Sequence, residues 1–127
     1  MSVIDDAVSW AIDIANDNTH GYDQTNRMGP DYDCSSFVSH AYAQAGAGVY
    51  AGDTTFSMKS DYLAHKFKDV TNQINLANGA GTKKGDVLLN ESNHTALVIA
   101  NGGRLAQASI NENGETTGGK TGDQTGT

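Results

Sequence analysis

The chain contains one cysteine, Cys34, in the stretch DYDCSSFVSH at residues 31–40. A single cysteine cannot form an internal disulfide, and alone it cannot hold a metal ion. Free cysteine is often a buried core residue, which is one interpretation of Cys34. The other is a nucleophile, because Cys34 ends a polar loop and begins a predicted helix, whose free N–H groups and dipole stabilise a thiolate. Cys34 is also predicted to lie at the polar boundary of this helix, whose buried face is formed by Phe37, Val38 and Ala41. This second interpretation requires a base near the thiol.

A cysteine nucleophile works with an imidazole that accepts and returns a proton, and with a third group that orients the imidazole. His40 follows Cys34 by six residues on the same predicted helix, so its ring points elsewhere. His20 lies in a polar loop and His65 late in a polar helix, where nothing fixes the ring. His94 begins the most apolar predicted strand, which holds its ring at the edge of the core. His94 is therefore the candidate base, and a purely structural histidine is the alternative.

The third group is predicted from the hairpin that follows His94. Side chains alternate between the two faces of a strand. Gln107 therefore shares a face with His94 only if the residue numbers of facing pairs have an odd sum. A four-residue loop pairs Ala96 with Gln107 and makes His94 the diagonal neighbour of Gln107, within side-chain reach. A register that pairs Ala100 with Arg104 turns Gln107 to the opposite face. We predict the longer loop, with Gln107 as the residue that orients His94.

Apolar residues recur at helical spacing in three segments, residues 3–16, 34–45 and 55–65. Ser2 and Asp5 resemble a capping box at the start of the first helix. Asp33 or Asp31 is placed to cap the second helix, and Gly46 suits its end. The polar segment between the first two helices is predicted to be a long functional loop.

The second half of the chain is typical of strands. Residues 87–89 are apolar after a turn-prone Lys-Gly, residues 94–100 are apolar on both faces, and residues 104–110 follow an Asn-Gly-Gly turn. Helices followed by antiparallel strands predict an α+β domain. The tail from residue 111 has almost no apolar residues.

Composition limits the classes of function. A length of 127 residues predicts one domain, and a net charge of −7 argues against nucleic acid and against anionic membranes or wall polymers as direct partners. The N-terminus lacks a basic start, and aspartates interrupt its apolar residues, so it does not resemble a signal peptide. We expect synthesis in the cytoplasm and no membrane insertion.

Two other chemical signals are rejected. Residues 114–121, GETTGGKT, match the phosphate-loop pattern, but no buried strand precedes them and no helix can follow before residue 127. The four histidines are scattered, without a second cysteine or a paired-histidine motif. We expect no metal and no cofactor.

Three blocks of the sequence resemble those of the NlpC-type papain-like cell-wall hydrolases. DCSSFV at residues 33–38 resembles the D-C-S-[GS]-[LF]-V signature of that family. GDVL at residues 85–88 and HTALV at 94–98 resemble its second block, a G-D-[LV] turn followed by H-[VT]-[GA]-[LI]. LAQAS at residues 105–109 matches the third block, in which the family usually has a second histidine. The resemblance covers roughly residues 2–110 and is closest to the catalytic domains of phage endolysins.

The resemblance implies a papain-like α+β fold, in which the cysteine helix packs on an antiparallel sheet that carries the histidine. It implies Cys34 as nucleophile, His94 as base and Gln107 as orienting residue, in place of the commoner histidine. Ser36 likewise replaces the commoner glycine. The resemblance further implies that Asp33 and Ser35 contact the stem peptide. It also suggests Tyr22 or Tyr32 for the oxyanion hole, beside the N–H group of Cys34.

The implied activity is a cysteine peptidase that cuts the peptidoglycan stem between D-glutamate (or D-glutamine) and the diamino acid at the third position. One alternative is an amidase that uses the same residues on the muramoyl–L-alanine bond. Another is a non-catalytic wall-binding module with a structural Cys34. The expected organisation is a single catalytic domain, residues 1–127, excised from a longer chain with C-terminal wall-binding modules. An endolysin of this kind accumulates in the host cytoplasm and reaches the wall when the phage permeabilises the membrane.

Overall fold

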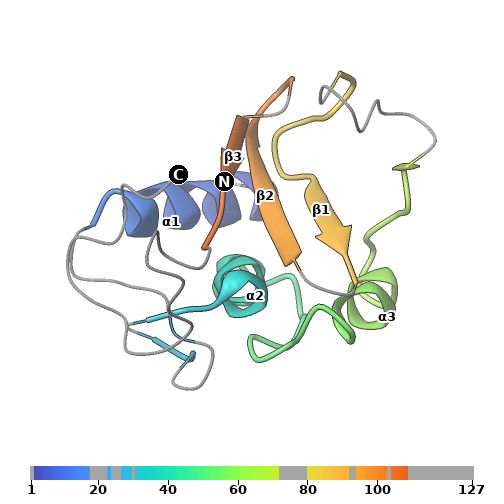
Figure 1. Ribbon diagram of the computed structural model, residues 1–127. Coiled ribbons are helices and arrows are strands. Elements are labelled where there is room, and N and C mark those ends of the chain that lie inside the picture. Colours follow the sequence, from blue (N-terminus) through green and yellow to red (C-terminus); the bar gives the residue numbers. More distant parts are fainter. Residues whose placement is uncertain are drawn as a thin grey trace.

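The computed structural model describes residues 2–17, 23, 27–29, 31–71, 80–91, 94–102 and 104–108. Three helices precede three strands: α1 (Val3–Ala15), α2 (Cys34–Gln44), α3 (Met58–Leu63), β1 (Val87–Asn90), β2 (His94–Ala100) and β3 (Arg104–Ala106). The strands form an antiparallel sheet in the order β1-β2-β3. Helices α1 and α2 pack against each other and against β2, and α1 also contacts β3 (Figure 1). The predicted mixture of helices and an antiparallel sheet is confirmed.

Local hydrogen bonds explain where the first two helices begin. The Ser2 hydroxyl accepts the N–H of Asp5 at 3.1 Å, as the sequence predicts. At the start of α2, Asp33 Oδ1 accepts the N–H of Ser36 at 2.8 Å, and Ser36 Oγ accepts the N–H of Asp33 at 3.0 Å. This capping box selects Asp33 as the N-cap and makes Cys34 the first residue of α2.

Helix α2 is buried on nearly all sides, so Cys34 does not lie at a polar boundary as the sequence suggested. The thiol-bearing residue is 7% exposed, and Ser35, Ser36 and Ser39 are also buried. Ser39 Oγ lies 2.7 Å from the hydroxyl of Tyr62 on α3, which satisfies both buried groups. Apolar residues of all three helices and of β2 complete the core, among them Val8, Val38, Ala41, Met58 and Leu97.

The turn before β1 is joined to the middle of β2. The N–H of Gly85 donates to the carbonyl of Val98 at 2.7 Å, and the N–H of Val98 donates to the carbonyl of Asp86 at 2.8 Å. Gly85 has a φ of +95°, and a Cβ there would lie 2.6 Å from a methyl group of Ile4. A larger residue would be strained at this φ and would have to displace the Ile4 side chain, so this turn favours glycine.

The hairpin between β2 and β3 agrees with the prediction in one part and contradicts it in another. Leu97 pairs with Ala106, the register that places Gln107 opposite Ala96, as predicted. Near the turn the predicted four-residue loop is wrong, because Ala100 pairs with Arg104. A register shift between Val98 and Ala100 reconciles the two pairings, since an extra residue on one strand changes the register on one side of a bulge only.

Two elements are shorter than predicted. Helix α3 begins at Met58 instead of residue 55, because the N–H of Thr54 bonds to Ser57 Oγ at 2.9 Å and the intervening residues form turns. Strand β3 ends at Ala106 instead of residue 110. The phosphate-loop match at residues 114–121 lies outside the described residues. Within the described part of the chain, no helix has both the length and the apolar character needed to cross a bilayer.

Candidate active site

His94 and Gln107 lie in direct contact at the end of the sheet where β2 begins and β3 ends. His94 is the first residue of β2, and Gln107 directly follows the last residue of β3. His94 Nε2 lies 2.8 Å from Gln107 Oε1. An amide oxygen can only accept a hydrogen bond, so Nε2 carries a proton in this pair. The other ring nitrogen, Nδ1, is then the one that can exchange a proton with a thiol.

The Cys34 side chain is the second partner of the His94 ring. Hydrogen bonding with Cys34 raises the pKa of His94, and the hydrogen bond with Gln107 and the negative charge of a Cys34 thiolate raise it further. Partial burial of the imidazole acts in the opposite direction and lowers this pKa. The net shift is upward, so the surroundings of the ring favour the imidazolium that accompanies a thiolate.

These contacts bring together the three residues that the sequence nominates for catalysis. Cys34 comes from the start of α2, His94 from the start of β2 and Gln107 from the position just after β3.

At the start of α2, Asp33 accepts the N–H groups of Ser36 and Phe37. No acceptor within the described residues engages the N–H group of Cys34. A free N–H at a helix start suits a developing oxyanion.

Arg27 organises the start of α2, a role that no local sequence pattern indicates. Its Nε donates to Asp33 Oδ2 and its Nη2 to Ser35 Oγ, each at 2.9 Å. Its other N–H groups reach the carbonyls of Gly52, at 2.9 Å, and Asp53. The Asp33 and Ser35 side chains are thus engaged with Arg27 and with each other, so in this structure they fix the helix that carries Cys34. Their predicted contact with a stem peptide stays a prediction.

Replacing Arg27 with methionine is expected to destabilise the fold. The Arg27 and Asp33 side chains are only 16% and 14% exposed, so the variant leaves a poorly solvated carboxylate without its cation. We expect a loss of about 2 kcal/mol and a fall of about 5–10 °C in the unfolding midpoint, measured by circular dichroism.

Lys59→Met is the matched control for that variant, because the Lys59–Asp69 pair is 3.9 Å apart and about half exposed on both sides, at 53% and 52%. The midpoint of this control should not change measurably. Equal midpoints for Arg27→Met and the wild-type protein would contradict the role of Arg27.

Tyr32 and His40 belong to an aromatic cluster that also contains Trp10 and Phe37. The Tyr32 ring lies 5.1 Å from the His40 ring and 5.5 Å from the Trp10 ring, and burial raises the pKa of its hydroxyl. The His40 ring stacks on Trp10, and its Nδ1 lies 3.1 Å from the carbonyl oxygen of Ser36. These contacts hold the His40 ring in the aromatic cluster. Tyr22 lies outside the described residues.

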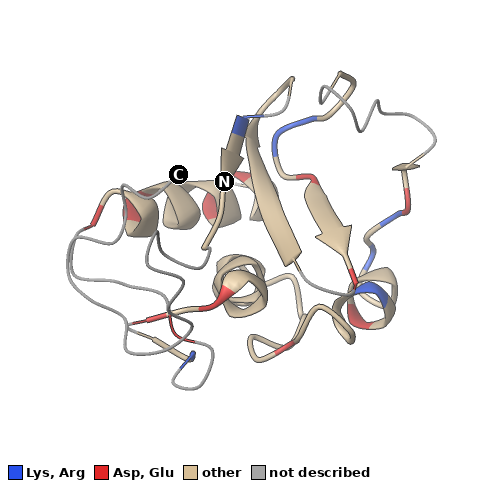
Figure 2. Ribbon diagram, in the orientation of Figure 1, with Lys and Arg blue, Asp and Glu red and all other residues tan. Residues whose placement is uncertain are grey.

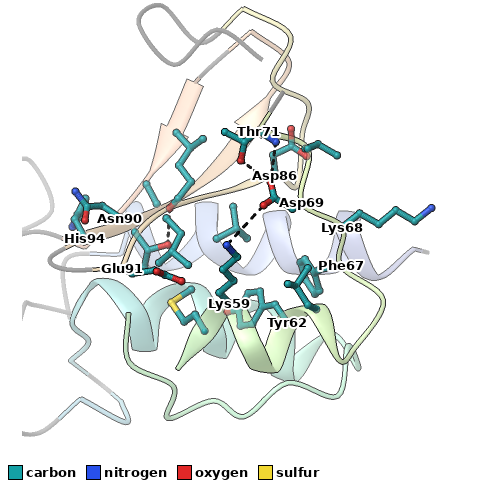
Figure 3. A pocket seen from close by; sticks show the side chains of 18 of the residues that line it. Lys59, Tyr62, Phe67, Lys68, Asp69, Thr71, Asp86, Asn90, Glu91 and His94 are labelled. Atoms are coloured by element: carbon teal, nitrogen blue, oxygen red, sulfur yellow. Dashed lines mark hydrogen bonds and ion pairs between the residues drawn. The ribbon is translucent and has the colours of Figure 1, made fainter. Parts of the chain in front are cut away.

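A groove of about 940 Å³ extends from His94 and Gln107 along β1. Its other walls come from α3 and from residues 67–71 (Figure 3). In Figure 3, His94 lies at one end of the groove and Lys68 at the other. Sequence reasoning did not predict this groove beside the imidazole.

In the described part of the chain, no three His, Cys, Asp or Glu side chains are grouped as a metal site requires. The described residues bring together at this site a thiol, an imidazole and an amide. No protein-family model, curated protein or solved structure matches this chain.

Proposed function

We propose that this chain is a cysteine peptidase of the peptidoglycan stem peptide, with a papain-like fold of the NlpC type. The bond cut is the one between the γ-carboxyl of D-glutamate, or of D-glutamate amidated at its α-carboxyl, and the α-amine of the diamino acid. The observation that carries the proposal is the 2.8 Å contact between His94 and Gln107, together with the rise that the Cys34 thiol produces in the pKa of His94. The three sequence blocks that resemble those hydrolases supply the substrate class.

The proposed reaction has two halves. The Cys34 thiolate attacks the γ-carbonyl carbon, and the N–H of Cys34 donates to the oxyanion that forms. His94 protonates the leaving amine from Nδ1 as the carbon–nitrogen bond breaks, which leaves a thioester on Cys34. Water then gives a proton to His94 and attacks the thioester, which releases the glutamyl acid and restores the Cys34 thiolate and the His94 imidazolium. Gln107 holds the ring in one tautomer throughout.

The charge of the chain favours a separate targeting module. In the described residues, Lys and Arg come from scattered places such as α3, the loop before β1 and the start of β3 (Figure 2). With a net charge of −7, the domain gains no attraction to an anionic wall. We therefore propose C-terminal wall-binding modules in the full-length protein, and release from the host cytoplasm during phage lysis.

Mass spectrometry of digested walls tests the proposed bond. Purified peptidoglycan of several types is incubated with the protein, and the new amino termini are identified. A new amine on the diamino acid supports the proposal. A new amine on L-alanine would assign the protein to the muramoyl–L-alanine amidases, which could use the same three residues. Binding to walls without any new amine would indicate a non-catalytic wall-binding module.

Gln107→Ala is expected to lower kcat/KM and to change its pH profile. The loss of one hydrogen bond to the imidazolium corresponds to about a tenfold to hundredfold decrease. The hydrogen bond with Gln107 raises the pKa of His94, so its removal lowers that pKa. The alkaline limb of kcat/KM, where the imidazolium loses its proton, should therefore move to lower pH.

Gln107→Glu is the companion variant, because a carboxylate keeps the acceptor and adds a negative charge. Its alkaline limb should move to higher pH than that of the wild-type protein. Identical pH profiles for all three proteins would show that Gln107 does not act on His94.

A further inference from the structure

Under the proposed function, the leaving half of the substrate lies in the groove beside His94. His94 must protonate the leaving amine, so the residue that carries this amine lies on the His94 side of the cut bond. In the proposed reaction that residue is the diamino acid, whose side chain ends in a second amine. The groove begins at His94 and continues along β1, so it can receive this side chain.

The walls of the groove suit a long aliphatic side chain with a charged end. Apolar residues dominate them, among them Met58, Leu63, Phe67, Val87 and Leu89. An aliphatic amine buries its methylene groups along such a surface and keeps its ammonium group at a polar position. Such an ammonium group requires a carboxylate in the groove that has no other partner.

Two of the three acidic residues in the groove are already engaged. Asp69 accepts the N–H and hydroxyl of Thr71, at 3.0 and 2.6 Å, and its other oxygen faces Lys59. Asp86 Oδ2 accepts the N–H of Lys83 at 2.9 Å. Glu91 is exposed and has no hydrogen-bond or ion-pair partner among the described residues. Figure 3 shows its side chain pointing into the groove, between His94 and Lys59.

We propose that Glu91 binds the free side-chain ammonium of the diamino acid that follows the cut bond. The enzyme then prefers stem peptides whose diamino acid is not cross-linked, because a cross-link converts this amine into a neutral amide. Glu91 thus determines specificity without taking part in bond breaking. The groove lining carries three acidic residues against two lysines, Lys59 and Lys68, a balance that slightly favours a cationic group over an anionic one.

Paired synthetic stem peptides test this assignment. Each pair has the sequence L-alanyl-γ-D-glutamyl-X-D-alanine, with the side-chain amine of X either free or acetylated, and X is lysine in one pair and diaminopimelate in the other. We expect the wild-type enzyme to cut the free-amine peptide of at least one pair with about tenfold higher kcat/KM, the effect of one charge-assisted hydrogen bond.

Glu91→Gln should reduce that ratio to about one, mainly by slowing cleavage of the free-amine peptide. Asp69→Asn removes the same charge from the same groove, but at an oxygen pair that is already engaged. This control should keep the preference for the free amine.

The failure of this assignment can be distinguished from the failure of the proposed function. Cleavage of both peptides of each pair at equal rates, or a ratio that Glu91→Gln leaves unchanged, overturns the role of Glu91 and leaves the peptidase proposal standing. A ratio abolished by Asp69→Asn instead of Glu91→Gln moves the ammonium site away from Glu91 and also overturns it. If the wild-type enzyme cuts none of the four peptides, the proposed bond is wrong, and the role of Glu91 is rejected with it.

Discussion

Cys34→Ser is expected to abolish the hydrolysis of purified peptidoglycan, with a loss of at least about a thousandfold. Serine has nearly the same shape, but its hydroxyl is far less acidic than a thiol, so the imidazole of His94 cannot generate the nucleophile at neutral pH. Release of dye-labelled wall fragments gives the rate, and mass spectrometry shows whether any new amine forms.

The fold of this variant must be checked separately, because Cys34 is only 7% exposed and lies at the start of α2. Its unfolding midpoint should stay close to that of the wild-type protein, since the capping box and the Arg27 contacts do not use the thiol. Ser39→Ala, on the same buried helix away from the imidazole, is the matched control. It should lower the unfolding midpoint, because it leaves the Tyr62 hydroxyl without its partner, but it should keep the activity when assayed well below that midpoint. Lysis that survives in Cys34→Ser would end the peptidase proposal and favour a structural thiol.

The helices that position Cys34 could be predicted because their signals are local. The start of α1 depends on Ser2 and Asp5, and that of α2 on Asp33 and Ser36, pairs only three residues apart. The alternation of side chains along a strand, which is equally local, placed Gln107 on the same face as His94. These local patterns predict the structure correctly because the packing of α1, α2 and β2 favours the same conformations.

The rest of the site depends on contacts between distant parts of the chain. Arg27 donates to the carbonyls of Gly52 and Asp53, which lie 25 and 26 positions away, and no local pattern indicates such a pairing. The bulge between Val98 and Ala100 likewise follows from the fit of two strands, so the predicted loop length was wrong. The groove beside His94 has walls from α3, residues 67–71 and β1, and only the assembled fold brings them together.

The burial of Cys34 also depends on the whole fold. The sequence placed this residue at the polar boundary of its helix, but the serines of α2 are buried as well. A thiol that is 7% exposed meets little bulk solvent. Its reactivity should then depend on the imidazole and not on general exposure to solvent.

His94→Ala is therefore expected to affect both catalysis and the thiol itself. Without the imidazole, no group protonates the leaving amine, and we expect peptidoglycan hydrolysis to fall by at least about a thousandfold. Because Cys34 and His94 act as one unit, the double variant with Cys34→Ala should be hardly slower than either single variant. In contrast, His40→Gln should retain activity within about twofold when it is assayed well below its unfolding midpoint, since the His40 ring packs on Trp10 and Tyr32.

Alkylation by iodoacetamide at neutral pH gives a readout that does not depend on any substrate. In the wild-type protein, Cys34 should react faster than free cysteine, because the imidazolium stabilises its thiolate. His94→Ala should slow this reaction by about tenfold or more, whereas His40→Gln should leave it unchanged. Equal labelling rates in the wild-type protein and His94→Ala would mean that His94 does not activate the thiol. The hydrogen bond between Cys34 and His94 would then be structural, and the two residues would no longer support a peptidase.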